Sequence, residues 1–171
     1  MLGTDFILRT LAADGIDHLF MVPGGLVDPF LPALGRVPAL TPVVAAHEGG
    51  AAYMADGYAR ASGKFGACLC IGGPGVTNTV TAISAAQADM SPVLVMSGEV
   101  SNFAQGLGLF QDATAGTFND SLVLAPVTAE SFSVPDVRAL PRALSGAVKK
   151  MLDGARVPVH LSIPHDVQTL E

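Results

Sequence analysis

The sequence contains no tryptophan, only two cysteines and only 14% charged residues. Its 9 basic side chains are outnumbered by 15 acidic ones, so it lacks the basic surface that binds nucleic acids or anionic membranes. No apolar run approaches the roughly 20 residues that span a bilayer, and the N-terminus lacks the basic and apolar regions of a secretory leader. We therefore expect neither a nucleic acid nor a membrane as partner, and we expect a soluble, cytoplasmic protein.

The two cysteines, Cys68 and Cys70, alternate within the apolar run of residues 66–71. In a strand, this spacing places both side chains on the same face, where neighbours in one chain segment make a poor disulfide. Zinc sites need further ligand pairs, and the sequence has none at a suitable spacing. We expect two small buried side chains in a reducing compartment, and no metal site.

Apolar residues are abundant, at 50% of a 171-residue chain, which suits a single domain over residues 1–171. Strands with nearly continuous apolar runs alternate with helical patterns, which is typical of a parallel sheet covered on both faces. The prediction is an α/β fold, three-layer α/β/α, with a mostly parallel six-stranded sheet. Strands are expected at 18–22, 40–45, 66–71, 92–97, 130–134 and 157–163, and helices at 4–13, 26–34, 48–62, 76–88, 112–124 and 136–152. The residues after Pro164 are expected to form a linker.

Ligands of such sheets gather at the carboxyl ends of the strands, so four loops are candidates for the site. These loops are residues 23–25, 46–50 and 72–75, and the long segment that contains residues 110–112.

The second loop places one carboxylate, Glu48, at a strand-to-helix junction, followed by Gly49 and Gly50. Each glycine costs about 1 kcal/mol relative to alanine inside a helix, which indicates that something approaches the backbone there. Spacing alone leaves open that Glu48 is an ordinary exposed acid of a first helical turn. The neighbouring His47 is either an acid–base group or, more commonly for a single histidine, a structural one.

The third loop, Gly72–Gly75, has the glycine content of a phosphate-binding turn but lacks both the dinucleotide-binding spacing and the lysine of a P-loop. A tight structural turn is the alternative. In the long segment, Gln111 offers a neutral donor and acceptor for a substrate carbonyl, although a surface amide is the ordinary case. No partner is evident for His18, His160 or His165.

In order and spacing, these stretches resemble the N-terminal pyrimidine-binding (PYR) domain of thiamine-diphosphate enzymes of the acetolactate synthase, pyruvate oxidase and benzoylformate decarboxylase superfamily. The acetolactate synthase branch is most similar. The likeness covers nearly the whole chain, and its most specific part runs from Glu48 to Arg60 with the Gly-Pro-Gly turn behind it. The matching stretches are residues 18–25, 46–60, 73–78, 91–98, 110–111 and 158–167.

The resemblance implies that Glu48 hydrogen-bonds a ring nitrogen of the aminopyrimidine of thiamine diphosphate and shares a proton with it, which activates the cofactor. It implies catalytic roles for Glu48 and Gln111 in the decarboxylation or carboligation of a small 2-oxo acid. The residues implied to approach the cofactor are Pro23, Gly24, Gly25, Glu48, Pro74 and Asn78, and those implied to face the substrate are Phe110 and Gln111.

In this family a separate domain with a Gly-Asp-Gly motif holds the diphosphate and its magnesium, and the sequence contains no Gly-Asp-Gly. A central domain, which binds FAD in some members, is missing as well. The resemblance therefore implies a chain that is inactive alone, an excised domain or one subunit of a split enzyme. Its partners would be a diphosphate-binding domain of the same or another subunit, in a homo-oligomer. The competing interpretation is a non-catalytic nucleotide-binding or regulatory module that holds phosphate at Gly72–Gly75.

Overall fold

The computed structural model describes residues 1–114, 116 and 118–171. Its sheet has six strands in the order β2-β1-β3-β4-β6-β5, and every neighbouring pair is parallel. The strands are β1 (His18–Met21), β2 (Thr41–Val44), β3 (Gly66–Ile71), β4 (Val93–Glu99), β5 (Ser131–Ser133) and β6 (Val159–Pro164). The predicted six-stranded parallel sheet is confirmed.

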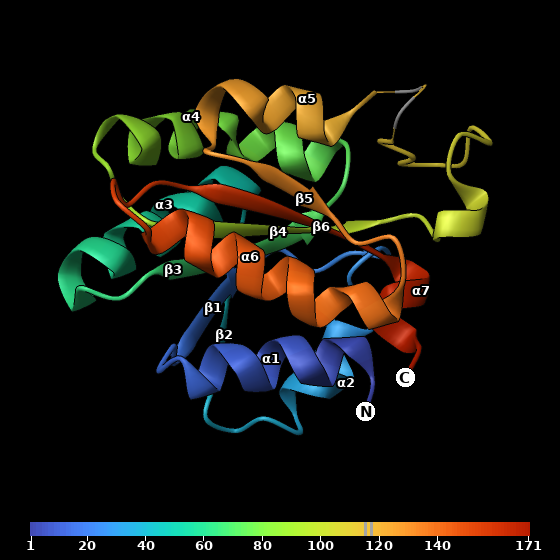
Figure 1. Cartoon of the computed structure of the whole chain (residues 1–171), viewed down its shortest axis with the longest axis horizontal. Coiled ribbons are helices and arrows are strands. Elements are labelled where there is room, and N and C mark those ends of the chain that lie inside the picture. The colour runs from blue at the N-terminus through green and yellow to red at the C-terminus, as the bar shows by residue number, and fades with distance from the viewer. Residues whose placement is uncertain (115, 117) are drawn as a thin grey trace.

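Helices cover both faces of this sheet, as predicted for three layers (Figure 1). On one face lie α1 (Gly3–Ala13), α2 (Phe30–Leu34) and α6 (Leu140–Leu152), with α7 (His165–Thr169) beside α1; on the other lie α3 (Glu48–Ser62), α4 (Pro74–Ala88) and α5 (Asp120–Leu124). Three short 3-10 turns occupy 102–104, 125–127 and 137–139. Among the described residues, no helix combines the length and the apolar character needed to cross a membrane.

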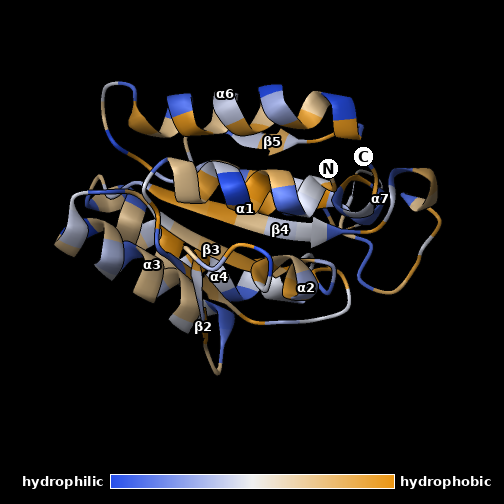
Figure 2. Cartoon of the chain, turned by 90° about the horizontal axis from the view of Figure 1, so that it is seen from below, coloured by the Kyte–Doolittle hydropathy of each residue, from blue (hydrophilic) through white to orange (hydrophobic). Residues whose placement is uncertain are grey.

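Two apolar layers, one on each face, form the core because the side chains of the buried strands alternate between them. In β3, Ala67 and Leu69 pack toward α1 and α6, whereas Cys68 and Cys70 pack toward α3 and α4. Figure 2 shows the middle strands largely in apolar colours between helices of mixed colour. Both cysteines are free and buried on one face, as expected, and burial raises the pKa of the Cys68 thiol to about 12.

The prediction of a linker after Pro164 is wrong, because α7 folds there. The Gln168 amide donates to the carbonyl oxygens of Ile163 at 2.8 Å and Leu26 at 2.9 Å, and Gly3 N donates to Leu170 O at 3.1 Å. These tertiary bonds compensate for a helix too short to be stable alone. The helix expected over 112–124 is also shorter, since α5 spans only Asp120–Leu124, and residues 115 and 117 lie outside the described part.

Candidate functional site

The candidate site lies at the carboxyl edge of the sheet, where the strand order changes direction between β1 and β3. From β1 the chain continues to β2, at one edge of the sheet, and then crosses to β3 on the opposite side of β1. This reversal is the switch point at which ligands of open α/β sheets bind. The loops after these strands are adjacent: a Cβ on Gly24 would lie 2.7 Å from Ile71 Cγ2, at the end of β3. Gly24 therefore lets the first loop rest directly on the third.

Glu48 is the first residue of α3, and the residue as a whole is half-buried. His47 begins the helix by accepting a hydrogen bond at Nδ1 from Gly49 N at 3.0 Å, which gives His47 the structural role among its two alternatives. Glu48 Oε2 accepts a hydrogen bond of 2.9 Å from Asn78 Nδ2 on α4. The structure thus brings together two residues that the resemblance assigned to the cofactor.

The two glycines after Glu48 are there for different reasons. A Cβ on Gly49 would lie 3.0 Å from the Asn78 carbonyl oxygen, so the close contact between α3 and α4 requires glycine at this position. Gly50 is exposed, and a Cβ there would meet only the Ala45 methyl group at 4.0 Å. Nothing in the described chain explains the absence of a side chain at Gly50, which leaves backbone open beside Glu48.

The Gly72–Gly75 turn is held from beneath by two buried carboxyl groups, Glu99 at 1% and Asp120 at 2% exposure. Asp120 Oδ2 accepts a hydrogen bond of 2.9 Å from Gly73 N. Burial first, and then the nearby charge of Glu99, raise the pKa of Asp120 to about 7, and burial raises the pKa of Glu99. A bound phosphate would have to compete with Asp120 for that amide and would meet a negative field, so the geometry favours the structural interpretation of this turn.

Pro74 and Gln111 line one shallow hollow of about 390 Å³ at the start of α4. Gln111 is half-buried and has φ of +64°, a left-handed conformation that a residue with a side chain adopts at an energetic cost. Phe110 is 86% exposed and does not line the hollow. Pro23 and Gly25 are exposed in the first loop.

Sequence reasoning missed His160, which is fully buried in β6 between two serines. Its Nε2 lies 2.8 Å from Ser97 Oγ and its Nδ1 lies 2.6 Å from Ser131 Oγ, and burial lowers its pKa to about 4. His18 also has a partner, since its Nδ1 lies 2.7 Å from Asp17 Oδ1. Both contacts correct the statement that these histidines have no partner. The signal for His160 was the alternation of polar residues at 160 and 162 within an apolar strand.

Sequence reasoning also missed Glu99 and Asp120. A usable signal existed for Glu99, because an acid follows directly after the apolar run of β4. For Asp120 the signal was an Asn-Asp pair before an apolar run, in which Asn119 caps α5 by accepting from Leu122 N at 3.1 Å. Among the described residues no group of three or more His, Cys, Asp or Glu side chains is placed to hold a metal ion.

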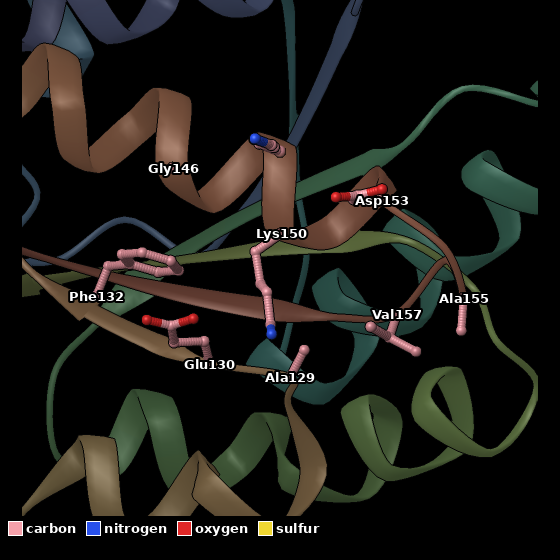
Figure 3. Close-up of a pocket in the computed structure, with 9 residues that line it drawn as sticks. Ala129, Glu130, Phe132, Gly146, Lys150, Asp153, Ala155 and Val157 are labelled. Atoms are coloured by element: carbon pink, nitrogen blue, oxygen red, sulfur yellow. The ribbon is translucent and has the colours of Figure 1, made fainter.

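A second hollow, of about 470 Å³, lies far from these residues between α6, β5 and the segment that precedes β6 (Figure 3). Glu130 and Lys150 point into it from β5's side and from α6, so its charges are mixed. It contains none of the predicted site residues.

Comparison with known proteins identifies the family. Residues 1–120 match the family model described as "Thiamine pyrophosphate enzyme, N-terminal TPP binding domain". The chain belongs to this family. This membership confirms the resemblance drawn from the loops at the carboxyl edge, and it covers the loops that hold Glu48, Asn78 and Gln111.

Among the curated relatives of this thiamine pyrophosphate domain are large subunits of acetolactate synthases. The chain is 38% identical over 169 residues to the probable acetolactate synthase large subunit of Methanocaldococcus jannaschii. The aligned residues make up 98% of this chain and 27% of that protein. It is 35% identical over 170 residues to the acetolactate synthase large subunit of Lactococcus lactis. Here the aligned residues make up 99% of this chain and 28% of that protein. The chain thus spans less than a third of the length of these relatives.

The residues at the carboxyl edge fit the pyrimidine end of thiamine diphosphate and do not fit its phosphates. Glu48 offers a carboxylate beside the uncovered backbone of Gly50, which suits a flat ring with a basic nitrogen. The four loops contain neither lysine nor arginine, including the whole segment 98–119. With Glu99 and Asp120 beneath the third loop as well, these four loops offer no cationic side chain for a diphosphate.

Proposed function

We propose that this chain provides the pyrimidine-binding half of a thiamine-diphosphate-dependent 2-oxo acid decarboxylase or carboligase of acetolactate synthase type. The observation that carries the proposal is the hydrogen bond of 2.9 Å between Glu48 and Asn78 at the switch point of the sheet. This bond fixes the carboxylate of a half-buried glutamate at the start of a helix, with open backbone next to it. Membership of the thiamine pyrophosphate family supports the choice of cofactor.

The roles of the residues follow from their positions. Among the described residues Glu48 is hydrogen-bonded through Oε2 alone, so Oε1 is available to a ring nitrogen of the aminopyrimidine. Asn78 holds the carboxylate in place, and Glu48 shares a proton with that nitrogen, an interaction that offsets the cost of desolvating the carboxylate. When bound, the cofactor supplies a nucleophilic carbon that adds to the carbonyl group of a 2-oxo acid. Gln111, beside the turn that begins α4, is positioned to donate to that substrate.

The proposal requires a partner that holds the diphosphate and its magnesium. The absence of a Gly-Asp-Gly sequence, and of lysine and arginine from the four loops, supports a separate diphosphate-binding domain in the same or another subunit. A flavin nucleotide, if the complete enzyme uses one, would also bind outside this chain. The competing function, a nucleotide-binding module, is less well supported because Asp120 already occupies the Gly73 amide.

The decisive experiment is Glu48→Gln in the enzyme assembled from this chain and a diphosphate-binding domain. Proton exchange at the thiazolium carbon, measured by quenched-flow NMR, is expected to fall about 100-fold or more, because general acid–base catalysis is lost. Glu130→Gln, which removes an exposed acid at the distant hollow, is the matched control. Unchanged exchange in Glu48→Gln would refute the assignment.

A second experiment tests the division of labour between domains. Calorimetric titration of this chain alone with thiamine diphosphate and magnesium is expected to give little heat, because the four loops offer the phosphates no cationic side chain. Tight, magnesium-dependent binding would contradict the need for a partner domain.

A further inference from the structure

We propose that Glu99 and Asp120 form a proton-sharing carboxyl pair that positions the Gly72–Gly75 turn against the loop that carries Gln111. The pair touches neither the cofactor nor the substrate, so both acids are positioning residues. The inference rests on the proposed function for its purpose, since the turn leads into the Pro74–Asn78 segment. Its geometry stands independently of any cofactor.

The two carboxyl groups converge on one point. A Cβ built on Gly72 would lie 3.1 Å from Asp120 Oδ2 and 3.3 Å from Glu99 Oε2, and 2.9 Å from the Gly98 carbonyl oxygen. Gly72 therefore has no room for a side chain, because the Gly98 carbonyl oxygen and the two acids surround that point. The two residues come from different elements, the end of β4 and the start of α5, so only the fold brings them together.

Hydrogen bonds from this pair reach both halves of the candidate site. Asp120 Oδ2 accepts from Gly73 N at 2.9 Å, which ties α5 to the turn. Asp120 N donates to Ala113 O at 3.0 Å, and Ala113 N donates to Glu99 Oε1 at 3.4 Å, two residues after Gln111. The pair thus forms a joint between the turn and the Gln111 loop, and a change in its protonation acts on both.

Among the described residues that surround the pair, none carries a positive charge, and this favours a shared proton. A cavity of about 190 Å³ beside the pair has only neutral side chains as its other lining, namely those of Gln105, Ala113, Thr114, Asn119, Ser121, Ser133 and Ser162. The other titratable groups that act on the pair are Asp112, in the Gln111 loop, and Cys70, in β3, and neither is a cation. Within the described residues, the buried Oδ1 of Asp120 accepts no hydrogen bond.

Two adjacent buried anions without a cation are costly, whereas one proton between them turns repulsion into attraction. The pair is expected to hold one proton at low pH, with the carboxylate oxygen of Asp120 still accepting from Gly73. Burial raises the pKa of Asp120 to about 7, so this proton is released to solvent as the pH rises through that value. The two anions then repel each other, but the hydrogen bond from Gly73 N favours the ionised carboxylate of Asp120, so the bond to the turn strengthens.

Exchange of the Gly73 amide proton, measured by NMR on this chain between pH 5 and pH 9 and corrected for intrinsic exchange, tests the proposal without any cofactor. In the wild type, protection is expected to rise about tenfold as the pH rises through 7, because the ionised carboxylate is the stronger acceptor. In Asp120→Asn the amide oxygen still accepts from Gly73 but carries no charge, so protection is expected to keep the wild type's low-pH level at every pH. In Asp120→Ala it is expected to be about tenfold lower throughout.

Glu99→Gln provides a second variant in case the alanine variant does not fold. It is expected to move the rise in protection to lower pH, because the charge that opposes ionisation of Asp120 is gone. Equal, pH-independent protection in the wild type and Asp120→Asn would overturn the shared proton. High protection in Asp120→Ala would overturn the positioning role. In the assembled enzyme, Asp120→Asn is expected to retain the cofactor affinity of the wild type, whereas Asp120→Ala is expected to lose it. Failure of that last comparison alone, with the exchange results as expected, would count against the proposed function and not against the pair.

Discussion

The side-chain amide of Asn78 donates a 2.9 Å hydrogen bond to Glu48 Oε2 and so joins the first residue of α3 to the second turn of α4. The same two helices touch where the Asn78 carbonyl oxygen faces the missing side chain of Gly49. One residue of α4 therefore fixes both the backbone and the carboxylate at the start of α3. This double contact is the basis of the first prediction.

Asn78→Ala is expected to slow proton exchange at the thiazolium carbon of the bound cofactor about tenfold, because Glu48 loses a hydrogen bond made to its charged form. The control is Thr81→Ala, an exposed position three residues further along α4. Quenched-flow NMR of the assembled enzyme measures both variants. Equal rates for the two would show that Asn78 does not orient the carboxylate.

Gly50→Ala is expected to stabilise the chain by about 1 kcal/mol, since alanine is the better helix former and the new methyl group meets only Ala45. It is also expected to weaken the apparent affinity for thiamine diphosphate about tenfold in the assembled enzyme, because the methyl group covers the backbone beside Glu48. Gly57→Ala, in the same helix with open space around the new Cβ, provides the control. It should give a similar gain in urea denaturation with no change in affinity.

Gln111→Gly is expected to stabilise the chain by roughly 1 kcal/mol, because glycine adopts the left-handed backbone at 111 without strain. The same change removes the side-chain amide and is expected to raise the KM for the 2-oxo acid while cofactor affinity stays constant. Met90→Gly relieves the same kind of conformation, at φ of +52° in the turn after α4, away from the site. If both variants leave KM unchanged, Gln111 is not a substrate residue.

The buried side chain of His160 makes the free energy of unfolding fall at acid pH. Burial lowers the pKa of His160 to about 4 from its ordinary value of 6.5, so the folded state resists protonation. Its contribution to stability is complete above pH 6.5 and is lost as the pH falls toward 4, on the order of 3 kcal/mol in all. His160→Asn has no titrating ring. Urea denaturation at pH 7 and pH 4.5 should show a smaller decrease for this variant than for the wild type, and equal decreases would disprove the assignment.

Local patterns were sufficient to predict the sheet and the position of Glu48. The central strands β3 and β4 contain continuous apolar runs, and the junction before α3 carries its acid and two glycines side by side in the sequence. Features that depend on strand order were not predictable in the same way. The partners of His160 come from β4 and β5, which flank β6 in space because the sheet order departs from the chain order.

The acid pair and α7 escaped prediction for a related reason. Glu99 and Asp120 are 21 positions apart, and only the packing of α5 beside the end of β4 brings their carboxyl groups to the same glycine. Helix α7 is five residues long and depends on the bonds of Gln168 to the distant Leu26 carbonyl group and to Ile163 in the preceding strand. No periodic pattern can develop over so few residues, so tertiary contacts decide this segment.

The hydrogen bond from Gly3 N to Leu170 O places the two ends of the chain next to each other, beside α7 at the carboxyl ends of the strands (Figure 1). A tether fused to either terminus would therefore start at the same edge of the sheet as Glu48, the edge formed by the carboxyl ends of the strands. A short flexible tether gives its cargo an effective concentration in the millimolar range near its point of attachment. Fusion of a diphosphate-binding domain at either end would thus raise its encounter rate with this edge without any change to the domain's surface.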